Sequence, residues 1–236
     1  MNVLNEFSQI KEVALRSPLS GFIDDEKLST EWEALRFHSK PDLNQATIEY
    51  NYFRDLLQDD GINIIDLPSS KLLTIDSIYT RDSILISQEG LILCNMGRSS
   101  RTPEAMENFN TLTSQGYEIA GQIEAPGTLE GGDFIWIDDH HAAVGHGPRT
   151  NAEGIRQLKE ILGSSVELHV VMLPEPKHPD DVLHLMSIIS PLDKDLALIY
   201  KPFMPISFLN WLSTVSYTHL RAHETREDLV CRRQLE

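Results

Sequence analysis

The chain has 236 residues, 41% of them hydrophobic, and its 36 acidic and 20 basic residues give a net charge of −16. This charge argues against binding to nucleic acid or to an anionic membrane, and the length supports one substantial core. No apolar run approaches the roughly 20 residues of a membrane span, and two cysteines cannot build a disulfide framework. We therefore expect a cytoplasmic protein with reduced thiols and no membrane partner.

The first third of the chain has signals for two strands and one helix. Residues 12–19 predict a short strand that ends in a proline turn, and residues 17–21 then predict a loop. Residues 42–58 predict a helix, because Pro41 precedes them and Gly61 follows. A buried strand is expected over residues 62–67.

A unit of hairpin, helix and strand then repeats along the chain. The first unit is expected as a hairpin over 83–95, a helix over 102–115 and a strand over 117–123. The second is a hairpin over 134–145, a helix with a Thr or Asx cap over 150–162 and a strand over 166–173. The third is a hairpin over 185–200 and a helix that begins near residue 205. The pattern predicts an α/β fold in which each module is one blade, buried only against its neighbours.

Residues 216–236 differ from the rest, because they show neither a helical nor a strand period. Their sequence is typical of translated sequencing-adapter read-through. We therefore expect a catalytic domain over residues 1–215 and a non-native tail over 216–236.

Three polar residues stand at equal intervals, each before an apolar hairpin. Asp82, Asp133 and His184 are separated by 51 residues in each step. If the modules pack around an axis, these side chains converge on it. Two carboxylates and an imidazole at one point form an acid–base site for a cationic substrate.

Two acidic motifs sharpen this expectation. Thr128 to Asp133 reads Thr-Leu-Glu-Gly-Gly-Asp, and its paired glycines place Glu130 and Asp133 at a tight bend. Asp76 and Asp82 are six apart, so on a strand they would face the same side and hold the edges of a guanidinium. Solvated turn acids, or Asp82 paired with Arg81, are the structural alternatives.

Two arginines stand at helix starts. Arg149 and Arg101 could each hold a substrate carboxylate there, whereas surface arginines are the alternative. His184 lies on an apolar segment, where Glu130 is expected to keep it protonated. The other histidines of the second half show no ligand spacing, so no metal site is expected; they are His140, His141, His146, His169 and His178.

Four motifs together resemble the guanidine-modifying (amidinotransferase, or pentein) superfamily, and most closely the dimethylarginine dimethylaminohydrolases. They are Tyr79-Thr80-Arg81-Asp82, Leu129-Glu130-Gly131-Gly132-Asp133, Gly147-Pro148-Arg149-Thr150-Asn151 and His184-Leu185-Met186-Ser187. The resemblance spans roughly residues 10–215. It implies an α/β propeller of ββαβ modules, incomplete here because the last blade is missing, and a cysteine nucleophile without metal or cofactor.

The resemblance also implies roles for single residues. His184 would be the general acid and base, and Glu130 would act with it at the guanidinium. Asp76, Asp82 and Asp133 would bind substrate, Arg101 and Arg149 would hold its carboxylate, and Leu19 would belong to a lid. The implied reaction is hydrolysis of dimethylarginine to citrulline and dimethylamine, with a small cationic molecule as the partner and a homodimer as a possible assembly.

The expected nucleophile is missing. The family's cysteine would follow the helix near Pro205, where this chain has the tail; Cys231 has no hairpin around it, and Cys94 lies in an apolar strand. We therefore expect this chain to be inactive by itself. Two alternatives stay open: an arginine deiminase or amidinotransferase of the same superfamily, and a non-catalytic arginine-binding or assembly protein on the same fold.

Overall fold

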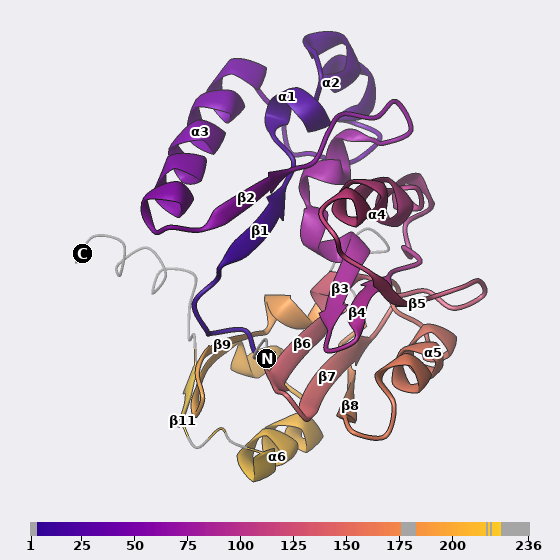
Figure 1. Ribbon diagram of the computed structural model, residues 1–236. Coiled ribbons are helices and arrows are strands. Elements are labelled where there is room, and N and C mark those ends of the chain that lie inside the picture. The colour runs from indigo at the N-terminus through magenta and orange to yellow at the C-terminus, as the bar shows by residue number, and fades with distance from the viewer. Residues whose placement is uncertain (1–3, 176–182, 216, 218, 223–236) are drawn as a thin grey trace. The chain divides into compact units, whose positions relative to one another are not determined.

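The computed structural model describes residues 4–175, 183–215, 217 and 219–222, which form two compact units (Figure 1). The N-unit consists of residues 9–122, and the C-unit consists of the described residues of 1–8 and 123–236. Within the described residues, no helix is both long enough and apolar enough to cross a membrane.

The N-unit begins with a parallel pair of strands joined by helices. The elements are β1 (Glu12–Leu15), α1 (Pro18–Gly21), α2 (Asp25–Glu31), α3 (Leu43–Asp59) and β2 (Asn63–Asp66). The expected helix is confirmed as α3, which Asp42 caps by accepting a hydrogen bond from the backbone N–H of Gln45. The loop expected over 17–21 was wrong. Ser17 is the N-cap of α1, and its Oγ accepts a hydrogen bond from the backbone N–H of Ser20.

The rest of the N-unit is one complete ββαβ module. Its elements are the 3₁₀ turns η1 (Ile75–Ile78) and η2 (Thr80–Ser83), the hairpin β3 (Ile84–Ser87) and β4 (Gly90–Leu93), the turn η3 (Ser99–Arg101), α4 (Glu104–Ser114) and β5 (Ile119–Gln122). β3 pairs with β4 antiparallel and β4 pairs with β5 parallel. Gly90 has φ +133°, and an added Cβ would lie 2.6 Å from the carbonyl oxygen of Glu118, so this turn needs glycine.

The C-unit contains two further modules of the same order. The first has η4 (Gly131–Asp133), β6 (Phe134–Asp138), β7 (His141–His146), α5 (Ala152–Leu162) and β8 (Glu167–Met172). The second has η5 (Leu185–Ser187), β9 (Ile189–Asp193), β10 (Leu196–Ile199), η6 (Lys201–Phe203), α6 (Ile206–Val215) and β11 (His219–Ala222). In both modules an antiparallel hairpin is followed by a parallel strand. The mixed α/β class and the module order are confirmed; closure of the modules into a propeller stays a prediction.

The chain continues the third module past residue 215. Residues 219–222 form β11, parallel to β10, and Tyr217 is buried in the core of the C-unit. We had expected no strand after residue 215, and for residues 219–222 this expectation was wrong. A strand at this place completes the third ββαβ module, since the edge of β10 offers unpaired backbone groups after the helix.

The core of the C-unit joins its two modules. Ile135 and Ile137 of β6 belong to the same buried cluster as Phe208 and Leu212 of α6. At the edge of this cluster, the ring of His169 on β8 stacks on Trp211, with ring centroids 4.6 Å apart. His169 is therefore a packing residue and not a turn or surface residue as expected.

The repeat is less regular than the spacing of its polar residues indicated. The first hairpin strands of the three modules begin at Ile84, Phe134 and Ile189, so the intervals are 50 and 55 residues. Asp82 and Asp133 lie two residues and one residue before their strands, whereas His184 lies five residues before its own. The equal intervals of 51 residues therefore do not mark equivalent positions in the modules.

Candidate active site

The Glu-Gly-Gly-Asp motif forms a buried 3₁₀ turn in the C-unit. Glu130 stands at the start of η4 with extended backbone, Asp133 ends the turn, and their exposed fractions are 0% and 1%. The two glycines are also buried, so the motif is not a solvated hairpin turn. Because buried carboxylates need partners, the surroundings of this turn decide its chemistry.

The imidazole of His184 lies between the two carboxylates of this turn. Its Nε2 is 3.5 Å from Oε2 of Glu130, and its Nδ1 is 3.1 Å from Oδ1 of Asp133. The second approach is a close contact without in-line hydrogen-bond geometry. His184 starts η5, where its own N–H donates to Oγ of Ser187. A ring with an acid on each nitrogen is suited to take up and release a proton.

Arg149 contacts the same glutamate. Its Nη1 is 3.1 Å from Oε1 and 3.3 Å from Oε2 of Glu130, and 19% of the Arg149 side chain is exposed. Glu130 thus already holds one guanidinium group. The expectation that Arg149 binds a substrate carboxylate stays a prediction.

The turn is fastened to the start of α5. Asn151 accepts hydrogen bonds from the backbone N–H of Thr128 and of Gly154 and donates to the carbonyl of Pro126. Gly154 lets the backbones approach, because an added Cβ would lie 2.0 Å from the carbonyl oxygen of Thr128. Gly145 makes similar room, since its Cβ would lie 3.2 Å from Oδ1 of Asp133. These glycine roles were not visible in the sequence.

Asp82 lies in the N-unit, in η2, and Asp76 lies in η1, so the two acids are on 3₁₀ turns and not on one strand. Oδ2 of Asp82 accepts a hydrogen bond of 2.7 Å from Nη1 of Arg101. The same guanidinium donates to both carboxylate oxygens of Glu104, at 2.8 Å each, and to the carbonyl of Tyr79. Most donors of Arg101 are thus taken up inside the protein. Its binding of a substrate carboxylate stays a prediction, and the geometry favours a role in fixing Asp82.

Burial and hydrogen bonding shift the pKa values of the Arg101–Glu104 ion pair in opposite directions. Burial raises the pKa of Glu104 above its ordinary value, and the hydrogen bonds from Arg101 only partly oppose this. Burial alone would lower the pKa of Arg101, but the hydrogen bonds and charge of Glu104, with Asp82, raise it overall. Glu104 was not predicted from the sequence, because its acidic side chain at a helix start is typical of an exposed first turn.

The other expected binding residues of the N-unit lie nearby in the chain. Asp76 is 4% exposed, and its Oδ2 accepts a hydrogen bond of 2.8 Å from Nη1 of Arg98. Leu19 lies on the short helix α1 and is 58% exposed. An exposed leucine is compatible with the expected lid, which the structure leaves untested.

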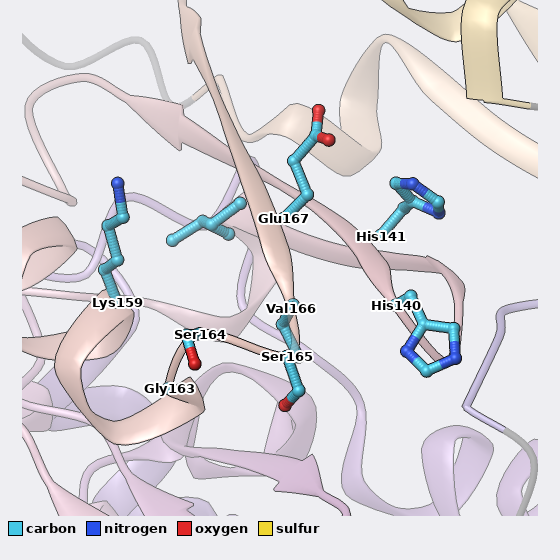
Figure 2. A pocket seen from close by; sticks show the side chains of 9 residues that line it. His140, His141, Lys159, Gly163, Ser164, Ser165, Val166 and Glu167 are labelled. Carbon is cyan, nitrogen blue, oxygen red and sulfur yellow. The ribbon is translucent and has the colours of Figure 1, made fainter.

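A cavity of about 450 Å³ lies elsewhere in the C-unit, beside β8 (Figure 2). Its polar side chains include Lys159, His140 and His141. Figure 2 shows the lysine on one side of the strand and both histidines on the other, so these groups do not converge on one ligand. A binding site needs polar groups that point to one place, and these three do not.

Among the described residues the only cysteine is Cys94, which is 4% exposed at the end of β4. Burial in an apolar environment disfavours the thiolate that attacks a substrate. This agrees with its interpretation as a core residue. Cys231 and His178 lie outside the described residues.

The modules and the acid-flanked histidine define an α/β protein of the pentein class. The chain belongs to the dimethylarginine dimethylaminohydrolase family: the model described as "N,N dimethylarginine dimethylhydrolase, eukaryotic" matches residues 28–207. The N(G),N(G)-dimethylarginine dimethylaminohydrolase of Pseudomonas aeruginosa is 34% identical over 139 residues, which are 56% of this chain and 54% of the relative. That of Streptomyces coelicolor is 31% identical over 137 residues, or 57% and 49% of the two chains.

A solved structure extends the likeness over more of the chain. A dimethylarginine dimethylaminohydrolase in its adduct with S-methyl-L-thiocitrulline matches with a TM-score of 0.70 and 25% identity, covering 92% of this chain and 78% of that one. The chain spans about half the length of the curated relatives that it matches. Membership of the family and the fold class predicted from the four motifs are thus confirmed.

Proposed function

We propose that this chain supplies the guanidinium-binding and proton-transferring part of an enzyme that hydrolyses dimethylarginine to citrulline and dimethylamine. The observation that carries the proposal is the imidazole of His184 between Glu130 and Asp133, all within the C-unit. The names of the two curated relatives and the thiocitrulline adduct of the solved structure support the substrate class.

Glu130 is the residue that meets the cationic end of the substrate. Its buried carboxylate already holds the guanidinium of Arg149, so it has the charge and the planar geometry that a guanidinium needs. A bound dimethylguanidinium would share or replace that contact. Positioning of the reacting carbon in this way can contribute up to about 7–11 kcal/mol to a rate.

His184 handles the protons. A thiolate attacks the guanidinium carbon, and the imidazolium of His184 gives its proton to the departing dimethylamine. The ring then takes a proton from water, which attacks the thiouronium carbon; citrulline forms and the thiolate is released. The thiolate does not come from Cys94, which is buried, so the proposal places it outside the described residues.

Titration calorimetry with dimethylarginine tests the binding step. We expect Glu130→Gln to weaken binding by roughly 10- to 100-fold, because a charged hydrogen-bond partner is lost, and His184→Ala to keep binding within a few-fold. Glu153→Gln, a partly exposed acid on α5 that pairs with Arg156, is the matched control and should bind like the wild type. Equal affinity of the Glu130→Gln variant would refute the role of this carboxylate.

Mass spectrometry of the same mixtures tests the chemistry. We expect negligible citrulline from the 236-residue chain; clear turnover would show that a cysteine of this chain is the nucleophile. A preference for arginine over dimethylarginine would favour the arginine deiminase alternative, and binding without turnover in a chain that carries the nucleophile would favour the non-catalytic one.

Other assignments stay proposals of the family resemblance. They are the substrate contacts of Asp76, Asp82, Asp133, Arg101, Arg149 and Leu19. A homodimer and a cytoplasmic location are likewise expected and untested.

A further inference from the structure

Thr150 precedes α5 but does not cap it. Asn151 is the N-cap residue, since its side chain accepts a hydrogen bond of 2.8 Å from the backbone N–H of Gly154. The sequence had left a Thr cap and an Asx cap open. With the cap provided by Asn151, the hydroxyl of Thr150 is available for another partner.

That hydroxyl bridges the two ends of the Glu-Gly-Gly-Asp turn. Oγ1 of Thr150 donates a hydrogen bond of 2.7 Å to Oδ2 of Asp133 and accepts one of 3.2 Å from the backbone N–H of Glu130. Thr150 is fully buried. A buried hydroxyl with both a donor and an acceptor bond holds its partners in one arrangement.

The bridge decides which oxygen of Asp133 faces the histidine. With Oδ2 held by Thr150, Oδ1 accepts from the backbone N–H of Leu185 at 3.1 Å and lies 3.1 Å from Nδ1 of His184. The terminal torsion of an aspartate is broad, so the carboxylate alone would not select this orientation. Gly145 leaves room for Oδ1 at this place, because an added Cβ would lie 3.2 Å from it.

We propose that Thr150 is a positioning residue that orients Asp133 and, through it, keeps Nδ1 of His184 protonated and Nε2 available for proton transfer. The proposal rests on the proposed function, because it assigns the acid–base role to His184. The hydroxyl of Thr150 hydrogen-bonds to the carboxylate of Asp133 and to the backbone of Glu130, so its effect passes through the carboxylate and the backbone.

NMR of the ¹⁵N-histidine-labelled full chain tests the proposal without substrate. The ring nitrogens of neutral His184, assigned with His184→Ala, report the ratio of the Nδ1–H to the Nε2–H tautomer. We expect Thr150→Val to lower this ratio about tenfold, the factor that corresponds to one hydrogen bond to a charged group. Thr150→Ser should restore it to within about twofold, because it keeps the hydroxyl.

Two comparisons separate positioning from a general effect on folding. Thr128→Val removes the hydroxyl of a neighbouring half-buried threonine and should leave the ratio unchanged. In an Asp133→Asn background, Thr150→Val should cause no further change, because the two residues act as one unit. If the valine variant does not fold, Thr150→Cys keeps the size with a weaker donor and should shift the ratio in the same direction.

A wild-type tautomer ratio in a folded Thr150→Val or Thr150→Cys variant would overturn the proposal. So would an equal drop in the Asp133→Asn background. Calorimetry with dimethylarginine on the same samples tests the proposed function separately. If the wild-type chain binds no dimethylarginine while Thr150→Val still lowers the tautomer ratio, the proposed function is refuted and the positioning role stands.

Discussion

Two turns of this protein hold a carboxylate in front of a hairpin, one in each unit, and they hold it by different means. Asp82, in η2, accepts a hydrogen bond from the cation of Arg101. Asp133, in η4, accepts from neutral donors, the hydroxyl of Thr150 and the amide of Leu185. Neutral donors leave the negative charge of Asp133 uncompensated, so it acts on the neighbouring imidazole.

The two donors differ in the further partners that they need within their units. A buried arginine must itself be paired, and Glu104 supplies the second acid, although burial raises the pKa of that group. The hydroxyl of Thr150 needs only one further hydrogen bond, which the backbone of Glu130 provides. We infer that the N-unit turn is stabilised by charge pairing and the C-unit turn by shape and hydrogen bonds.

The largest expected effect comes from breaking the charge pairing of the N-unit. Arg101→Met should lower the free energy of unfolding of this unit by about 3–5 kcal/mol, because Glu104 is then buried without its cation. Hydrogen exchange of the β3 and β4 amides measures this change separately from the C-unit.

Two variants make that result specific. Arg101→Met combined with Glu104→Met should recover much of the loss, because an apolar pair of similar size replaces the ions. Arg156→Met removes an exposed arginine, paired with Glu153, and should leave unfolding unchanged. A double variant as unstable as the single one would contradict the pairing argument.

A smaller effect is expected from the close backbone contact behind the C-unit turn. Gly154→Ala should destabilise the C-unit by about 1–3 kcal/mol, because the added Cβ meets the carbonyl of Thr128. Helix propensity alone predicts the opposite, a gain of about 1 kcal/mol. Gly147→Ala is the control, since its Cβ would make ordinary contacts of 3.4 Å or more with Leu173. Urea unfolding that shows a stabilised Gly154→Ala variant would refute the contact.

The smallest effect is expected from pH, and it should appear in the C-unit. Burial lowers the pKa of His169 below its ordinary value of 6.5, and the charge of Glu167 only partly opposes this. The native state therefore binds this proton less readily than the unfolded chain. The contribution of neutral His169 to the free energy of unfolding is complete above about pH 6.5. It is lost as the pH falls below that value.

His169→Phe keeps the stacking on Trp211 and removes the titration. Thermal unfolding of this variant at several values between about pH 7.5 and 5.5 should give a flatter profile than the wild type. His38→Asn, at an exposed position of the N-unit, should keep the wild-type slope. An unchanged slope in His169→Phe would show that other groups cause the pH dependence.

Most of the secondary structure was predictable, because its signals are local. Asp42 and Asn151 cap their helices, Gly90 adopts positive φ within the hairpin expected over 83–95, and Gly163 does so directly after the helix expected over 150–162. The 3₁₀ turns before the hairpins were missed, since their residues have no distinct period. The strand over residues 219–222 was missed because only the free edge of β10 selects it.

The amino-acid sequence by itself determined the module order and the family, because periodicity, caps and short motifs depend on near neighbours. It also singled out Glu130, Asp133 and His184, which the structure brings together. The tertiary structure alone decided which donor each buried acid received: Arg101 for Asp82, Thr150 for Asp133. These partners are 19 and 17 residues away in the chain. Packing brings them together, and the cost of burying an unpaired charge then selects the pairing.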